Sequence, residues 1–273
     1  MKHSFHLIAI QRGRFEDHFL VRAVRSISFL IVFIASINTT SSHAETYFGV
    51  FGGYEFDPKP TNLTAMEDEG YSTSTANLHA SKSSDLQLKQ SPVGGMKLGA
   101  FLDSQPDIGF EISAMYSRPD MKRQNVTITI IDGSNFAGFD TFVEDQLPAD
   151  FNFITTQASL IYRFMNFDHI RPYVGIGPVA YIVFIHGDGR SGKLVSPFVA
   201  PGYNNGTLGD GFGKGLGISG KVGLEYLIDK NWSLDFEYQI SKGSINIDHF
   251  RSFSDMKVDF SDQIFTTGLR YRF

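Results

Sequence analysis

Two short motifs carry residue types that could do chemistry. The segment Gly187-Asp-Gly-Arg-Ser-Gly-Lys193 matches the Gly-x4-Gly-Lys core of a phosphate-binding loop, in which backbone N–H groups and the lysine hold phosphate oxygens. Leu194, however, stands where a Ser or Thr would bind Mg²⁺, and Pro197 argues against a helix N-terminus at this point. The segment is rich in glycine, so we interpret the match as a coincidence.

The second motif is His79-Ala80-Ser81, in which a base and a nucleophile are two residues apart. Nucleophilic catalysis needs the base to be held against the nucleophile by a third, orienting group. The nearest downstream acid is Asp85, and the whole segment is expected in a long polar connection. The sequence therefore predicts no catalytic residue, and we do not expect an enzyme.

Candidate metal ligands do not form a recognisable pattern. The chain has no cysteine, which excludes thiolate sites and disulfides. Four histidines lack metal-ligand spacing, namely His79, His169, His186 and His249. Four aspartates near the C-terminus could hold Ca²⁺ at the surface, although a solvated charged rim is favoured: Asp248, Asp255, Asp259 and Asp262. We therefore expect no metal and no cofactor.

A larger set of charged residues recurs at alternating positions of strand-like segments. In the clearest segment, Trp232 to Ile240, every second residue is apolar and the residues between are polar. Because side chains alternate along a strand, each such segment has one apolar and one polar face. Ten charged residues share the polar faces: Glu55, Lys97, Glu111, Arg163, Lys221, Glu225, Asp235, Glu237, Arg270 and Arg272.

The elements that must position these residues are eight strands. They are expected at 47–56, 93–102, 108–116, 151–163, 172–184, 216–228, 232–240 and 259–273, and the phase of the fifth is uncertain because both its faces are apolar. The connections alternate between long and short: 57–92, 103–107, 117–150, 164–171, 185–215, 229–231 and 242–258. This alternation predicts an all-β fold, an eight-stranded antiparallel transmembrane β-barrel with four long surface loops.

The N-terminus has the features of a secretory signal peptide. An apolar run at 26–37 is too short to span a membrane as a helix, two arginines precede it, and Ser42-His43-Ala44 resembles a cleavage site. We therefore predict a signal peptide at 1–44 and a barrel domain at 45–273. Cleavage would remove five bases and two acids from totals of 24 and 29, which leaves a net charge of −8 and disfavours nucleic-acid binding.

The last strand ends on an aromatic residue. Thr266, Gly268, Tyr271 and Phe273 place a polar residue, a glycine and two spaced aromatic residues at the C-terminus. This ending resembles the C-terminal assembly signal of bacterial outer-membrane barrels. Together with the eight strands, it makes the chain resemble the small outer-membrane barrels, namely the OmpA transmembrane domain, OmpX and the Opa adhesins. The chain is also similar to alphaproteobacterial surface-antigen barrels.

The resemblance implies a location in the outer membrane of a Gram-negative bacterium, contact with outer-membrane lipid, and insertion by the barrel-assembly machinery. It also implies long extracellular loops that act on a host-cell or other surface ligand. The expected function is that of an adhesin, an antigen or an envelope-structural barrel. The alternative is a narrow porin that passes small solutes or ions.

Two details of the sequence bear on these alternatives. The ten inward charges are five acids and five bases, and an eight-stranded barrel leaves room for side chains only, so we expect a closed ion-pair network. Glu55 and Arg272 are expected near the rims, solvated and unpaired. Three aromatic residues in the second long loop, Phe136, Phe139 and Phe142, could anchor a partner or pack on the barrel rim.

Overall fold

The computed structural model describes residues 45–67, 79–132, 141–146, 149–187, 211–248 and 253–273. The predicted signal peptide lies outside these residues and remains a prediction. The described residues form eleven β-strands of one sheet. Among them no helix is long and apolar enough to cross a membrane.

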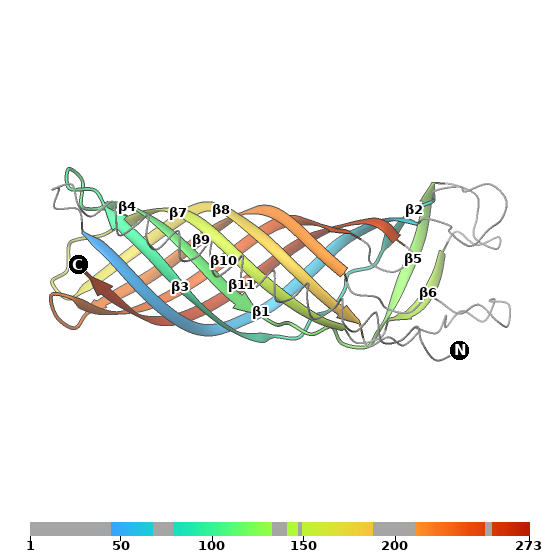
Figure 1. The fold of residues 1–273 in the computed structure, drawn as a ribbon, viewed down its shortest axis with the longest axis horizontal. Coiled ribbons are helices and arrows are strands. Elements are labelled where there is room, and N and C mark those ends of the chain that lie inside the picture. The colour runs from blue at the N-terminus through green and yellow to red at the C-terminus, as the bar shows by residue number, and fades with distance from the viewer. Residues whose placement is uncertain (1–44, 68–78, 133–140, 147–148, 188–210, 249–252) are drawn as a thin grey trace, which may run out of the picture. The chain divides into compact units, whose positions relative to one another are not determined.

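Eight of the strands form a closed antiparallel ring, which confirms the predicted all-β barrel (Figure 1). The ring closes because β11 pairs with β10 on one side and with β1 on the other, where Tyr47 faces Arg272. In order around the ring the strands are β1 (Thr46–Glu67), β3 (Ser91–Phe101), β4 (Ile108–Ser117), β7 (Ala149–Arg163), β8 (Ile170–Gly187), β9 (Gly211–Leu227), β10 (Trp232–Asp248) and β11 (Phe253–Arg272).

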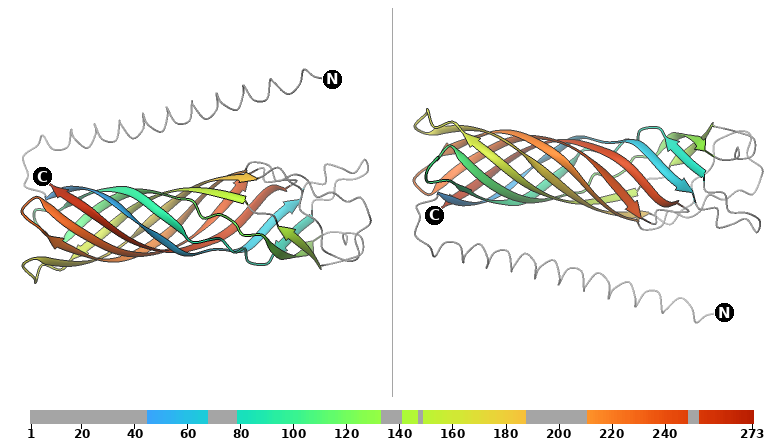
Figure 2. Two further views of the ribbon diagram at one scale, coloured as in Figure 1. Left: turned by 90° about the horizontal axis from the view of Figure 1, so that it is seen from below. Right: turned by 90° about the horizontal axis from the view of Figure 1, so that it is seen from above.

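The connections distinguish the two ends of the barrel (Figure 2). The short connections 102–107, 164–169 and 228–231 and the C-terminus lie at one end, here called the turn end, and the other end is called the loop end. The last of these turns is held by Asp229 Oδ1, which accepts the backbone N–H groups of Trp232 at 2.7 Å and Asn231 at 2.8 Å. These two hydrogen bonds lower the pKa of Asp229.

The strands are strongly staggered around the ring. Following paired residues from Glu55 once around the barrel leads back to β1 at Glu45, ten residues nearer its start. The path passes through Ile264, Gln239, Lys221, Gly175, Ile161, Gly109 and Phe101. The stagger tilts the strands, and eight tilted strands enclose an interior that side chains just fill.

The strands extend further toward the loop end than the sequence predicts. β10 continues to Asp248 and β11 begins at Phe253, so most of the predicted connection 242–258 is strand. β1 likewise continues to Glu67. It bends on the way at Asp57 and Asn62, whose φ angles are 53° and 51° and which lie at register shifts against β11. Asp and Asn tolerate this conformation better than most residues, which explains their place at the bulges.

A three-stranded extension continues the sheet at the loop end, and we call it the side sheet. It consists of β2 (His79–Ser83), β5 (Gln124–Asp132) and β6 (Thr141–Gln146). β2 pairs with the last residues of β1, β5 pairs with β2, and β6 pairs with β5. The two long connections that contain these strands were predicted to be loops, so that part of the prediction is wrong.

Candidate functional site

The interior of the barrel is the candidate site, and at the turn end it begins with a cluster around Glu45. Arg163 donates two hydrogen bonds to the Glu45 carboxylate, at 2.7 and 3.0 Å. The nearest guanidinium nitrogens of Arg171 and Arg272 lie 3.6 and 3.8 Å from the same carboxylate. Burial raises the pKa of Glu45, but the Arg163 hydrogen bonds and the three positive charges outweigh burial and lower it.

Two lysines and three acids form the centre of the interior. Lys97 Nζ donates to Asp235 Oδ2 at 2.6 Å and to Glu237 Oε2 at 2.9 Å. Lys221 Nζ donates to Glu111 and lies 3.5 Å from Glu237 Oε2. All five residues are buried, so each charge has an opposite charge in place of water.

Arg270 joins these pairs from the last strand. Its Nη2 atom lies 2.7 Å from Asp235 Oδ1 and donates to the Tyr173 hydroxyl at 2.9 Å. Tyr47 donates to Glu111 Oε2 at 2.5 Å. We call the six charged residues of the centre the charged layer: Lys97, Glu111, Lys221, Asp235, Glu237 and Arg270.

Glycines make room for the two tyrosines of this layer. Tyr47 is paired with Gly99 and Tyr173 with Gly223 on the neighbouring strands. A Cβ atom at Gly99 would lie 2.4 Å from the Tyr47 ring, and one at Gly223 would lie 2.2 Å from the Tyr173 ring. Only glycine therefore lets these inward rings lie flat against the barrel wall and reach the charged groups.

Two further acids lie closer to the loop end than the charged layer. Ser91 Oγ donates to Glu55 Oε2 at 3.3 Å, and Ser241 Oγ donates to Asp262 Oδ1. Glu55 is 1% exposed and Asp262 is 3% exposed. Among the described residues, no Lys, Arg or His forms an ion pair with either acid. Glu55 is thus unpaired, as expected, but it is buried, and the expectation of a solvated rim position is wrong.

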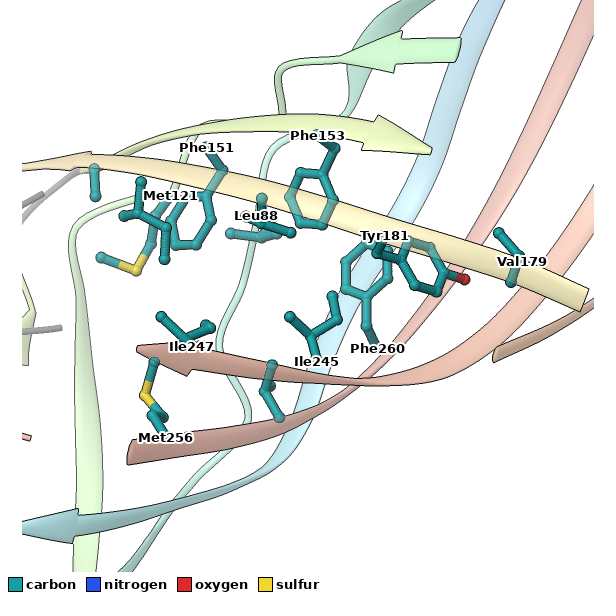
Figure 3. Close-up of a cluster of buried hydrophobic side chains, with 14 residues drawn as sticks. Leu88, Met121, Phe151, Phe153, Val179, Tyr181, Ile245, Ile247, Met256 and Phe260 are labelled. Atoms are coloured by element: carbon teal, nitrogen blue, oxygen red, sulfur yellow. The ribbon is translucent and has the colours of Figure 1, made fainter. Parts of the chain in front are cut away.

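The loop-end part of the interior is apolar, and we call it the apolar layer (Figure 3). Its centre is an aromatic group in which Phe153 stacks on Phe260 at 4.9 Å and Tyr181 meets Phe260 edge-on at 5.6 Å. The layer consists of Leu88, Met121, Ala149, Phe151, Phe153, Val179, Tyr181, Val183, Ile185, Ile245, Ile247, Met256, Val258 and Phe260. All fourteen residues are buried, and the sequence reading identified none of them as an interior cluster.

The two faces of the strands exchange polarity between the layers. On β10 the buried residues are polar up to Ser241 and apolar from Ile245 onward. The exposed residues of β10 change in the opposite sense, from apolar as far as Ile240 to Lys242 and Asn246 beyond it. β11 shows the same exchange, since its outer face from Phe265 to Phe273 is apolar except at Thr267 and is polar nearer the loop end.

The structure brings most of the ten predicted interior charges together. Six form the charged layer, while Arg163 and Glu225 lie 3.7 Å apart nearer the turn end. Arg272 is 7% exposed, lies near Glu45 and donates to the backbone oxygen of Asp229 at 3.0 Å. The expectation that Arg272 is solvated and unpaired is therefore wrong. Only Glu55 of the ten lacks a cationic partner among the described residues.

Several interior residues were missed. Glu45 and Arg171 lie just outside the predicted strands, so the period-two pattern did not include them. Asp262 was assigned to a charged rim with Asp259, but it points inward while Asp259 is exposed. Its even number, which it shares with the inward Arg270 of the same strand, was a signal for this orientation.

The C-terminal residues form an aromatic group at the turn end. The Tyr271 ring lies 4.9 Å from the Trp232 ring and 5.2 Å from the Phe273 ring, and Phe273 is 71% exposed. Thr266 faces inward, and a Cβ atom at Gly268 would lie 2.6 Å from the Val50 backbone oxygen. The geometry does not test a role in assembly.

The remaining candidate residues do not form a site. His79, Ala80 and Ser81 belong to strand β2 and not to a loop, and Gly187 ends β8 while the rest of the phosphate-loop match lies outside the described residues. Within the described residues, no group of three or more His, Asp or Glu could hold a metal ion. Phe136 and Phe139 lie outside the described residues, and Phe142 belongs to β6, in register with Ile128.

Comparisons with solved structures find outer-membrane proteins of low sequence identity. OprG from Pseudomonas aeruginosa aligns with a TM-score of 0.41 and 15% identity over 85% of this chain and 98% of its own. Neisserial surface protein A aligns with a TM-score of 0.36 and 12% identity, over 85% of this chain and 100% of its own. The outer membrane protease OmpT from Escherichia coli aligns with a TM-score of 0.48 and 12% identity, over 86% of this chain and 99% of its own. No curated protein matches the chain in sequence.

A family model gives a broader match. The model of the outer membrane protein beta-barrel domain matches residues 28–273, which is most of the chain and includes all eight strands of the ring. The closed ring, with an apolar outer face and a polar interior around the charged layer, agrees with this match, which places the protein in the outer membrane. The chain belongs to the outer membrane protein β-barrel domain family.

Proposed function

We propose that this barrel is a surface protein that acts through its loop end, as an adhesin, an antigen or an envelope-structural component, with an interior closed to solutes. The main support for this proposal is that side chains of the charged layer and the apolar layer occupy the interior of the barrel. A solute would have to separate the ion pairs of the charged layer and then cross the apolar layer, in which Tyr181 alone of the fourteen side chains carries a hydrogen-bonding hydroxyl group. Binding at the surface requires neither step.

The outer surface supports an orientation for this function. Exposed apolar residues surround the charged layer, whereas the outer face around the apolar layer is polar on β10 and β11. We propose that lipid contacts the first region and that the second region, with the side sheet, projects outside the cell. We further propose insertion by the barrel-assembly machinery and a host-cell or other surface ligand, without enzymatic activity, cofactor or nucleic acid.

A narrow porin is the second candidate, and one observation favours it. Gln157 Oε1 and Gln239 Nε2 are buried and have no hydrogen-bond partner within the part of the chain that the structure describes. Buried amide groups of this kind are usually satisfied, and water is a common partner. Water at these positions would form part of a polar path, although the apolar layer would still have to open.

Planar-bilayer recording separates the two candidates. The refolded wild-type barrel is expected to show small, flickering currents or none, and stable openings of nanosiemens size would support the porin. A Phe153→Ala/Phe260→Ala variant serves as the matched comparison because it thins the apolar layer and leaves the charged layer unchanged. If this variant conducts and the wild type does not, the apolar layer is what closes the barrel.

Labelling of intact cells tests the orientation. The chain has no cysteine, so a single introduced cysteine reports its own position. Lys122→Cys, exposed at the loop end, should react with a membrane-impermeant maleimide, and Lys230→Cys, exposed in a turn-end connection, should not. Equal labelling of the two variants would contradict the proposed orientation.

A further inference from the structure

The side sheet ends in an unpaired strand edge. The sheet order is β11-β10-β9-β8-β7-β4-β3-β1-β2-β5-β6, so β6 is its terminal strand. Residues Thr141 to Gln146 pair with Thr129 to Gln124 of β5, and within the described part of the chain no strand pairs with the other edge of β6. An edge of this kind presents backbone N–H and C=O groups that can pair with another chain.

The strand next to this edge is held firmly. Val126 of β5 is 1% exposed. Ser84 and Thr127 exchange two hydrogen bonds, from Ser84 N to Thr127 O at 2.8 Å and from Thr127 N to Ser84 Oγ at 3.1 Å. Gln124 Oε1 accepts the backbone N–H of Gln87 at 2.9 Å. The edge strand β6 therefore pairs with a neighbour that is itself held in place.

All charged residues in the segment that contains β6 are acidic. Residues 132–150 contain no Lys, Arg or His and five acids, namely Asp132, Asp140, Glu144, Asp145 and Asp150. Asp150 forms an ion pair with Arg118 on the neighbouring segment. Two copies of such an edge would repel each other, whereas a chain with positive side chains would be attracted.

We infer that the β6 edge binds an extended, basic peptide segment of a partner protein by adding it to the side sheet as a further strand. This inference rests on the proposed surface function and names the ligand class and the binding mode. Backbone hydrogen bonds supply the mode of binding. About three of the six β6 residues direct both backbone groups toward the added strand, as alternation in an antiparallel ladder requires. The acidic residues supply the charge preference.

Fluorescence anisotropy with the refolded full-length barrel in zwitterionic micelles tests this inference. The probe is the labelled peptide Thr-Lys-Val-Lys-Thr-Lys-Val-Lys, which is extended and basic. The control peptide has the same sequence with N-methyl groups on its four central residues, which block both hydrogen-bonding edges and keep every charge. We expect the control to bind about 10-fold more weakly. Equal affinity of the two peptides, or no binding of either, would overturn the inference.

Variants of β6 locate the binding. Val143→Pro removes a backbone donor from the edge and should abolish the difference between the two peptides. Because this change could also disturb the β5–β6 pair, Glu144→Gln/Asp145→Asn keeps the backbone and should weaken the unmodified peptide about 10-fold at low salt. The matched control is Asp57→Asn/Asp259→Asn, which removes two exposed charges elsewhere at the loop end and should leave binding unchanged.

Two further measurements separate the possible failures. A barrel that sediments as a dimer without peptide, and as a monomer when Val143 is proline, would assign the edge to a second copy and contradict the inference. The labelling of Lys122→Cys on intact cells tests the proposed function by itself. If that cysteine is labelled and the two peptides still bind equally, the surface function stands and strand addition at β6 is wrong.

Discussion

The charged layer and the apolar layer share strands β10 and β11, yet they are filled by opposite kinds of side chain. Around the charged layer the exposed residues of the outer face are apolar, so the alternation of a strand places polar residues inside. Around the apolar layer the outer face of β10 and β11 carries residues such as Lys242 and Asp259, and the same alternation places apolar residues inside. The polarity of the outer face of each part of the wall therefore goes with the opposite polarity of the side chains that fill the interior.

The two layers are also held together by different forces. Ion pairs in the charged layer replace water with a defined partner, so the removal of one partner leaves an uncompensated buried charge. The apolar layer depends on burial and close packing, where a lost side chain leaves a cavity. The exchange of polarity between Ile240 and Lys242 on β10 marks the boundary between the part stabilised by ion pairs and the part stabilised by apolar packing. Substitutions on either side of this boundary test the comparison.

The largest effect is expected from a broken pair in the charged layer. Lys221→Met removes the cation beside Glu111 and Glu237, both of which are buried. We expect the free energy of unfolding in lipid vesicles to fall by about 4 kcal/mol, because a carboxylate is left without its partner. Lys214→Met on the same strand removes an exposed lysine and serves as the control. Similar losses in the two variants would show that pairing does not stabilise the layer.

A smaller and more local effect is expected in the apolar layer. Phe260→Ala removes the ring that contacts both Phe153 and Tyr181 and should cost about 3 kcal/mol. Because the charged layer is unchanged, cleavage by an external protease should increase at the loop end while the lipid-embedded part stays protected. Lys257→Ala, an exposed position of β11, is the control. If cleavage of the Phe260→Ala variant increased in the lipid-embedded part as much as at the loop end, the two layers would unfold together and not independently.

The exchange of polarity also explains which strands could be read from the sequence. Wherever apolar residues face outward, alternation gave the number, order and facing of the strands, as in the segment from Trp232 to Ile240. Beyond Ile240 the strand keeps its geometry but reverses its hydrophobic phase, so the pattern no longer indicates a lipid-facing strand. The predicted end at Ile240 is the end of the apolar outer face and not the end of β10, which continues to Asp248.

The charged residues of the interior could be listed from the sequence, but their partners could not. Lys97 and Asp235 are 138 residues apart and meet across the interior. Which groups meet depends on the stagger of the strands, which alternation does not encode. Glu45 illustrates the same limit, since a residue outside every strand pattern binds an arginine of β7. β5 was missed for a different reason. Its strand-like residues lie in the connection 117–150, which was interpreted as a surface loop because it is long.

A third prediction concerns Glu45, which belongs to neither layer. Glu45→Gln keeps the shape but removes the charge that faces three arginines, and the free energy of unfolding should fall by about 2 kcal/mol at neutral pH. The pKa of Glu45 is lowered in the folded barrel, so its contribution is present above the unfolded pKa near 4.5 and is lost as the pH falls through the folded value. The difference between wild type and variant should therefore shrink below about pH 4.5.

Chemical unfolding of both proteins at a series of pH values measures this difference. Asp57→Asn, at an exposed acid of the loop end, is the control and should show little difference at any pH. A Glu45→Gln difference that persists unchanged in acid would show that the shape of the side chain matters and its charge does not.

The smallest change in stability is expected at the C-terminus, where neither layer is involved. Phe273 is 71% exposed and continues the aromatic group of Trp232 and Tyr271 at the turn end. Phe273→Asp should cost about 1 kcal/mol, because a charge near the membrane interface is tolerated far better than one at the midplane. Phe273→Tyr should be neutral, since an aromatic ring still lies at the interface.

The same residue also tests recognition of the C-terminus during assembly. If the assembly machinery recognises this terminus, deletion of Phe273 and Phe273→Asp should both lower the amount of heat-modifiable barrel in the outer membrane. The decrease should be far larger than a stability loss of about 1 kcal/mol explains. Wild-type levels of both variants would leave the terminus as a membrane anchor alone, and the strands themselves would then have to direct assembly.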